Sequence, residues 1–140
     1  MKATDLMLGD WVRHNEKPKK VDVIWHNNQV SLNDPEQEWG SIYTDKFPAD
    51  EIEPILLTRE ILINNGLEND WIYDKEEKRP ILFASNFKED DENILEISES
   101  ETGKIYWSIN CDEYGVLELK YVHVLQHALK LCNIDIEIKL

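Results

Sequence analysis

Apolar and polar residues alternate along much of the N-terminal third of the chain. Val21, Val23 and Trp25 form one alternating run, and a second run at residues 30–32 follows an Asn-Asn pair. A period of two predicts strands with one buried face, and paired asparagines favour a hairpin turn between them. Residues 1–56 are therefore expected to form a small curled β-sheet, a pattern that also fits an SH3-like barrel.

The pattern changes in the segment LTREILINNG, which predicts a short helix over residues 58–65. Thr58 has the side chain of a good N-cap, and Gly66 is typical of the position that ends a helix. We expect this helix to open a second, α+β subdomain that spans residues 57–140. The N-terminal β-subdomain would then end at residue 56.

Four apolar runs between residues 70 and 110 predict an antiparallel sheet: WIYD, PILFASNF, NILEISES and KIYWSIN. Their connectors are charged or contain glycine, as turns do. Residues from about 120 to 132 change to a helical period and predict a helix packed on this sheet. Residues 134–140 alternate strictly and predict a final strand with one buried face. The expected fold class is α+β.

The predicted C-terminal helix carries two histidines four positions apart. His123, Gln126, His127 and Lys130 recur on one side as a polar stripe. The opposite stripe is apolar and holds Val122, Leu125, Leu129 and Cys132. Two imidazoles at this spacing can bind zinc, so one alternative is a metal-dependent hydrolase that uses His123 and His127. Val124 stands where a zinc-protease helix carries its general base, so the stripe is expected to face solvent or a partner.

The charge is strongly negative, with a net value of −14. Residues 1–20 carry five basic and three acidic side chains, whereas the other 120 residues carry 10 basic and 26 acidic side chains. Such a surface repels phosphate backbones and anionic lipids, which disfavours direct nucleic-acid and membrane binding. It also allows a second alternative, an acidic mimic of nucleic acid that occupies the basic site of a DNA-binding protein.

Other chemical signatures are weak. Residues 89–101 hold seven acids and no base, but they lack the spacing of a calcium-binding loop and are typical of a solvated connector. The serines lack a G-x-S-x-G elbow, and Cys111 is flanked by acids. Cys111 and Cys132 have no metal-binding spacing, and the N-terminus has no apolar signal region. We expect a cytoplasmic protein with reduced thiols and no cofactor.

Four aromatic residues fall in the predicted N-terminal sheet: Trp11, Trp25, Trp39 and Tyr43. In a small sheet, aromatic rings either fill the core or line a shallow groove for an extended peptide. Trp11 and Trp25 are therefore candidate partner-binding residues, together with the polar stripe of the C-terminal helix.

Three sequence blocks occur in the order LMLGDWV at residues 6–12, IEPILLTREILINNGLE at 52–68 and KYVHVLQHALKL at 120–131. They resemble the blocks L-x-x-G-D/N-x-V, P-I-x-L-T-x-E-x-L and K-Y-V-H-x-L-Q of a family of short uncharacterised bacterial proteins, often linked to phages and mobile elements. The resemblance makes His123, Leu125 and Gln126 motif residues and implies no activity, cofactor or partner.

These observations together predict a non-enzymatic accessory protein that binds another protein.

Overall fold

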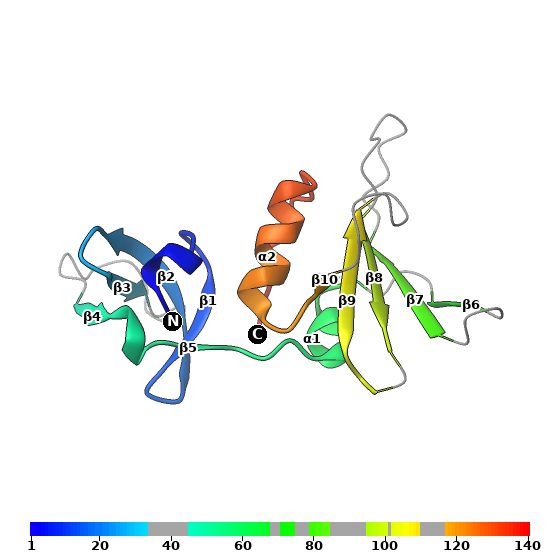
Figure 1. Ribbon diagram of the computed structural model, residues 1–140, viewed down its shortest axis with the longest axis horizontal. Coiled ribbons are helices and arrows are strands. Elements are labelled where there is room, and N and C mark those ends of the chain that lie inside the picture. The colour runs from blue at the N-terminus through cyan, green and yellow to red at the C-terminus, as the bar shows by residue number, and fades with distance from the viewer. Residues whose placement is uncertain (34–44, 68–70, 75–78, 85–94, 101, 110–116) are drawn as a thin grey trace. The chain divides into compact units, whose positions relative to one another are not determined.

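The computed structural model describes residues 1–33, 45–67, 71–74, 79–84, 95–100, 102–109 and 117–140 (Figure 1). The chain forms two compact units. The N-terminal unit comprises Met1–Leu56 with Tyr121–His123, and the C-terminal unit comprises Leu57–Lys120 with Val124–Leu140. Two antiparallel sheets and a C-terminal helix give the α+β class that the sequence predicts.

The N-terminal sheet has five strands in the order β4-β3-β2-β1-β5. Its elements are η1 (Ala3–Asp5), β1 (Trp11–His14), β2 (Lys17–Trp25), β3 (Gln29–Asn33), β4 (Lys46–Pro48), η2 (Ala49–Glu51) and β5 (Glu53–Pro54). The first four strands form a meander, and the fifth returns to pair with the first. Within the described residues β4 and β5 each have one neighbour, so the sheet is open and does not close into an SH3-like barrel.

Left-handed backbone conformations make the two hairpin turns of this sheet. Asn15 and Glu16 have φ angles of 50° and 63°, which suit a two-residue turn whose twist matches that of the strands. Asn28, with φ of 59°, lies in the second turn, between the paired residues Trp25 and Gln29. The hairpin predicted at the Asn-Asn pair is confirmed.

A β-bulge in β2 changes which side chains share a face. The register shifts between Val21 and Val23, which pair with the neighbouring residues Leu32 and Ser31 of β3. One extra residue on β2 therefore reverses the alternation beyond the bulge. The prediction that Val21, Val23 and Trp25 share one face is wrong, because Trp25 lies on the face opposite to Val21.

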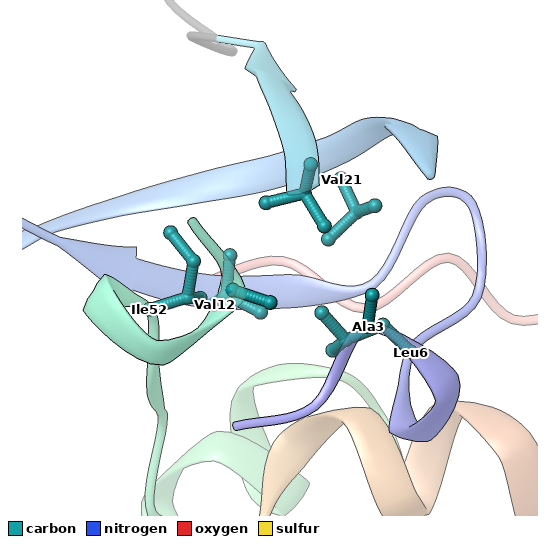
Figure 2. Close-up of a cluster of buried hydrophobic side chains, with 7 residues drawn as sticks. Ala3, Leu6, Val12, Val21 and Ile52 are labelled. Atoms are coloured by element: carbon teal, nitrogen blue, oxygen red, sulfur yellow. The ribbon is translucent and has the colours of Figure 1, made fainter. Parts of the chain in front are cut away.

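The inner face of the sheet carries the core of the N-terminal unit (Figure 2). Its buried members are Ala3, Leu6, Val12, Val21, Val30, Ala49 and Ile52. His14 of β1 contacts Phe47 of β4 with ring centroids 4.2 Å apart, although β2 and β3 separate these strands in the sheet. Such a contact requires a strongly curled sheet, as the sequence predicts.

The LMLGDWV block forms the turn that leads into β1. Gly9 has φ of 85°, a conformation that favours glycine. The Asp10 side chain is fully buried, and its Oδ2 accepts a hydrogen bond of 2.7 Å from the Met7 backbone N–H. The Val21 N–H in turn donates to the Asp10 carbonyl oxygen at 2.9 Å. Gly and Asp in this block therefore have structural roles.

Helix α1 (Arg59–Asn64) has the ends that the sequence predicts. Thr58 is the N-cap, and its Oγ1 accepts a hydrogen bond of 3.3 Å from the amide of the third helical residue. After Gly66, with φ of 70°, the Leu67 N–H donates to the Leu62 carbonyl at 3.0 Å. This is a Schellman closure, and both of its leucines are buried.

The C-terminal sheet is a five-stranded meander in the order β10-β9-β8-β7-β6 (Figure 1). Its strands are β6 (Trp71–Asp74), β7 (Arg79–Ala84), β8 (Leu95–Glu99), β9 (Ile105–Ile109) and β10 (Leu117–Glu118). The first four coincide with the four predicted apolar runs. The short β10 is not predicted, since two residues carry no readable period.

Helix α2 (Val122–Leu131) lies within the range predicted for the C-terminal helix. The predicted apolar stripe is confirmed, since Val122, Leu125, Leu129 and Cys132 are all buried. Just before α2, Tyr121 forms an isolated antiparallel bridge with Leu56. The IEPILL and KYVH segments of the sequence blocks therefore lie side by side.

The predicted C-terminal strand is wrong. Residues 134–140 are all described, and none of them lies in a strand. Ile134 and Ile138 are nevertheless buried, and the side chain of Asn65 holds the backbone of Lys139 by hydrogen bonds. The alternating pattern therefore reflects the burial of Ile134 and Ile138. The backbone hydrogen bonds that a neighbouring strand would make are made at Lys139 by the side-chain amide of Asn65.

Candidate partner-binding site

Trp25 ends β2 on the outer face of the N-terminal sheet, opposite to the core. Its indole Nε1–H donates a hydrogen bond of 3.2 Å to Oγ of Ser31 on β3. The ammonium nitrogen of Lys46 on β4 lies 3.8 Å from the centroid of the indole ring. Ser31 and Lys46 are directly opposite each other on β3 and β4. Paired residues have their side chains on the same face of the sheet, so both side chains can contact Trp25.

Burial differs sharply among these three residues, which we call the Trp25 cluster. Ser31 is fully buried, Trp25 is half-buried and Lys46 is exposed. The indole N–H therefore supplies a hydrogen bond to a buried hydroxyl. A cation–π contact at an exposed site contributes about 0.5–1 kcal/mol, enough to favour one position of a flexible ammonium. The cluster presents an oriented aromatic ring and a positive charge.

Gln29 lies beside this cluster, opposite Trp25 in the β2–β3 ladder. Its Oε1 accepts a hydrogen bond of 2.7 Å from Nδ2 of Asn27 in the preceding turn. This contact orients the Gln29 side chain, whose amide nitrogen is a hydrogen-bond donor.

Trp11, the other tryptophan expected to contact a partner, is placed differently. It alternates with the core residue Val12 and so lies on the outer face, but only 6% of its surface is exposed. The Lys20 ammonium lies 5.0 Å from its ring centroid. Trp11 therefore contributes mainly packing and leaves little area for a partner.

The polar stripe of α2 does not face solvent as a whole. His123 is only 6% exposed, and its ring stacks on Tyr121 with centroids 5.7 Å apart and an interplanar angle of 11°. Gln126 and His127 are half-buried, and Lys130 is exposed. The prediction of an outward-facing stripe is wrong at His123, which is buried and whose ring contacts Tyr121, the residue just before the helix.

The metal-site alternative can be compared with the geometry of the described residues. In that part of the chain, no group of three or more His, Cys, Asp or Glu side chains is close enough together to hold a metal ion. Trp39, Tyr43, Cys111 and most of the acidic segment 89–101 lie outside the described residues.

Cys132 is a buried thiol just after α2, and it is not part of a disulfide. Burial raises the pKa of the Cys132 thiol above its ordinary value of 9.0. Because the thiolate is the reactive form, this thiol is a packing residue with low nucleophilicity.

Lys46 and Ser31 belong to the candidate site but are not singled out by the sequence. Ser31 interrupts the apolar pair Val30 and Leu32, which is the usual pattern for a residue on the opposite face of a strand. Lys46 belongs to neither of the alternating runs that predict strands in residues 1–56. Only the β3–β4 ladder, which pairs residues 15 positions apart in sequence, reveals that they meet.

No helix among the described residues combines the length and the apolar composition needed to cross a membrane. Compared with models of known protein families, with curated proteins and with solved structures, the chain matches none.

Proposed function

We propose that this chain is a non-enzymatic accessory protein that binds another protein through the outer face of its N-terminal sheet. The observation that carries the proposal is the Trp25 cluster: a half-buried indole fixed by Ser31, with the Lys46 ammonium above its ring. Tryptophan is enriched among the residues that dominate binding energy at protein interfaces. An indole that is already oriented loses little entropy when a partner covers it.

The chemistry of the cluster favours recognition over catalysis. Ser31 is buried and its oxygen accepts the indole N–H, so the hydroxyl is placed as a structural support for the ring. Lys46 is exposed and offers a charge that a partner can pair with. The three residues thus supply contact area, orientation and a charge.

The test is affinity capture from a lysate of the source organism, with wild type and Trp25→Ala compared by quantitative mass spectrometry. We expect at least one captured protein to fall by about tenfold or more with the variant, because truncating a central interface tryptophan costs about 2 kcal/mol or more, which is about thirtyfold in affinity. Leu131→Ala removes an exposed apolar side chain, 68% exposed on α2, and serves as the matched control.

Trp25→Ala also removes a hydrogen bond, so thermal unfolding must show that each variant is folded. Lys46→Ala leaves the Trp25–Ser31 bond in place and provides a second probe of the same face. If every captured protein binds both variants as well as wild type, the outer face is not the interface and the proposal fails.

A further inference from the structure

The C-cap residue of α1, Asn65, is followed directly by glycine, and Asn65–Gly66 is the one Asn-Gly pair in the sequence. Asparagine is a thermolabile residue, because the backbone nitrogen of the next residue can attack its side-chain carbonyl carbon. Glycine has no Cβ and crowds that nitrogen least, so an asparagine before glycine reacts most readily. A reactive dipeptide therefore lies at the point where Asn65 holds the backbone of Lys139.

The reaction is an intramolecular loss of ammonia followed by addition of water. The Gly66 nitrogen forms a bond to Cγ of Asn65, the bond from Cγ to Nδ2 breaks, and ammonia leaves with the proton of the Gly66 amide. Water then opens the cyclic imide. Opening at Cγ gives aspartate at position 65. Opening at the main-chain carbonyl carbon gives isoaspartate, whose main chain runs through the former side chain.

The folded backbone at this pair opposes ring closure. The imide requires the Gly66 nitrogen to approach the side of Asn65 that carries Cβ, whereas a ψ angle of 10° nearly eclipses it with the Asn65 amide nitrogen. The Gly66 N–H also donates to the Ile63 carbonyl oxygen at 3.0 Å, and the Leu67 N–H fixes the same turn through the Leu62 carbonyl oxygen. Ring closure therefore requires this turn to open locally.

Three hydrogen bonds hold the Asn65 carboxamide itself. Its Nδ2 donates to the carbonyl oxygens of Ile61 and Lys139, each at 2.8 Å, and its Oδ1 accepts from the Lys139 N–H at 2.7 Å. Two of the three bonds therefore run to residues 133–140, which we call the C-terminal segment. While this segment is in place, Cγ of Asn65 cannot turn toward the glycine nitrogen without breaking both bonds.

We propose that Asn65 is a site of spontaneous deamidation, and that release of the C-terminal segment sets its rate. When the segment leaves, the carboxamide and the turn are free to form the imide. The product makes the release permanent, because an aspartate carboxylate has no N–H to donate to the carbonyl oxygens of Ile61 and Lys139. Isoaspartate in addition lengthens the main chain inside the turn that Gly66 closes.

The experiment incubates the purified full chain in native buffer or in guanidinium chloride and follows the peptide that contains residue 65 by mass spectrometry. A methyltransferase that labels isoaspartate distinguishes the two products. We expect conversion in the folded protein to be about tenfold or more slower than in the denatured chain, because only the locally open fraction reacts. Hydrogen exchange at the Lys139 amide should be faster in the deamidated protein than in the unmodified protein.

Two variants loosen the C-terminal segment and leave the Asn65–Gly66 pair intact. Ile138→Ala removes a buried side chain of the segment, and Lys139→Pro removes the N–H that donates to Oδ1 of Asn65. Each should raise the rate of conversion in native buffer by about threefold or more. Ile52→Ala is the matched control, since Ile52 is also 1% exposed but lies in the core of the N-terminal unit. Its rate should stay within about twofold of wild type.

All rates are measured well below the thermal unfolding midpoint of each variant, so that global unfolding does not contribute. The proposed site is rejected if the denatured chain is converted at position 65 and the folded protein is not, or if both are converted at the same rate. Control by the segment is rejected if neither Ile138→Ala nor Lys139→Pro accelerates conversion more than Ile52→Ala does. Unchanged exchange at Lys139 after conversion would contradict a permanent release.

Discussion

Asn65 and Lys139 lie 74 positions apart and exchange two hydrogen bonds. The Lys139 backbone N–H donates to Oδ1 of Asn65 at 2.7 Å, and Nδ2 of Asn65 donates to the Lys139 carbonyl oxygen at 2.8 Å. A side-chain carboxamide offers a donor and an acceptor side by side, as a peptide group does. One residue after α1 therefore fixes the C-terminal segment of the chain.

We expect Asn65→Ala to destabilise the protein by about 1–2 kcal/mol, because it removes both bonds and a third from Nδ2 to the Ile61 carbonyl. Hydrogen exchange at the Lys139 amide should also accelerate. Asn64→Ala, at an exposed neighbouring position of α1, is the control and should change stability by less than about 0.5 kcal/mol. Unchanged exchange at Lys139 in Asn65→Ala would show that the two bonds do not hold the segment.

The second prediction concerns the buried carboxylate of Asp10. Asp10→Ala should lower the free energy of unfolding by about 1–3 kcal/mol, because the Met7 N–H loses its acceptor in a buried turn. Asp10→Asn keeps an acceptor oxygen and should cost less than the alanine variant. Urea unfolding measures both, with Asp22→Ala at an exposed position as the control. Equal losses in Asp10→Ala and Asp22→Ala would contradict a structural role for this carboxylate.

The third prediction follows from the raised pKa of Cys132. The folded protein keeps this thiol protonated at pH values where the unfolded chain has begun to ionise, so the unfolded chain binds fewer protons. The stabilisation is complete below the ordinary value of 9.0 and is lost as pH rises above it. Wild type should therefore lose more unfolding free energy between pH 8 and pH 10 than Cys132→Ala.

Thiol labelling tests the same group at a single pH. At pH 8, a thiol reagent should modify Cys132 much more slowly in the native protein than in urea. Rapid native labelling at Cys132, identified by peptide mass spectrometry, would mean that the thiol is neither buried nor protonated as described.

The parts of the fold that the sequence predicts well are those determined by neighbouring residues. Thr58 caps α1 through a bond to the third helical residue, and Gly66 ends the helix with a left-handed backbone. Both interactions join residues that lie within one or two helical turns of each other. The Asn-Asn hairpin is equally local, because the turn determines which residues of β2 and β3 pair next to it, from Trp25 and Gln29 to the bulge.

The errors arise where a residue outside an element makes a contact that the pattern within the element does not contain. The isoleucines of residues 134–140 alternate as a strand would, but Asn65 supplies the partner that a strand would need. His123 belongs to a polar stripe on the helical wheel, yet Tyr121 stacks on its ring. A helical wheel compares positions within one helix and contains no information about the chain that precedes it.

Only Trp25 of the candidate site can be predicted from the sequence, because the contacts of the other two residues depend on how distant segments pair. Trp25 can be nominated from its residue type, because large aromatic side chains on a small sheet are frequent contact residues. Its two companions come from β3 and β4, and their meeting depends on a ladder between segments that the sequence does not show to be paired.

Asp22, the extra residue of the bulge in β2, has no partner on β3. Because side chains alternate with a period of two, the same residues running on from Val21 without a bulge would turn the indole of Trp25 toward the interior and Ile24 toward the surface. The extra residue is what lets Trp25 lie on the outer face while Ile24 packs against the core. The outer aromatic surface therefore depends on an irregularity of the backbone as well as on the residues that form it.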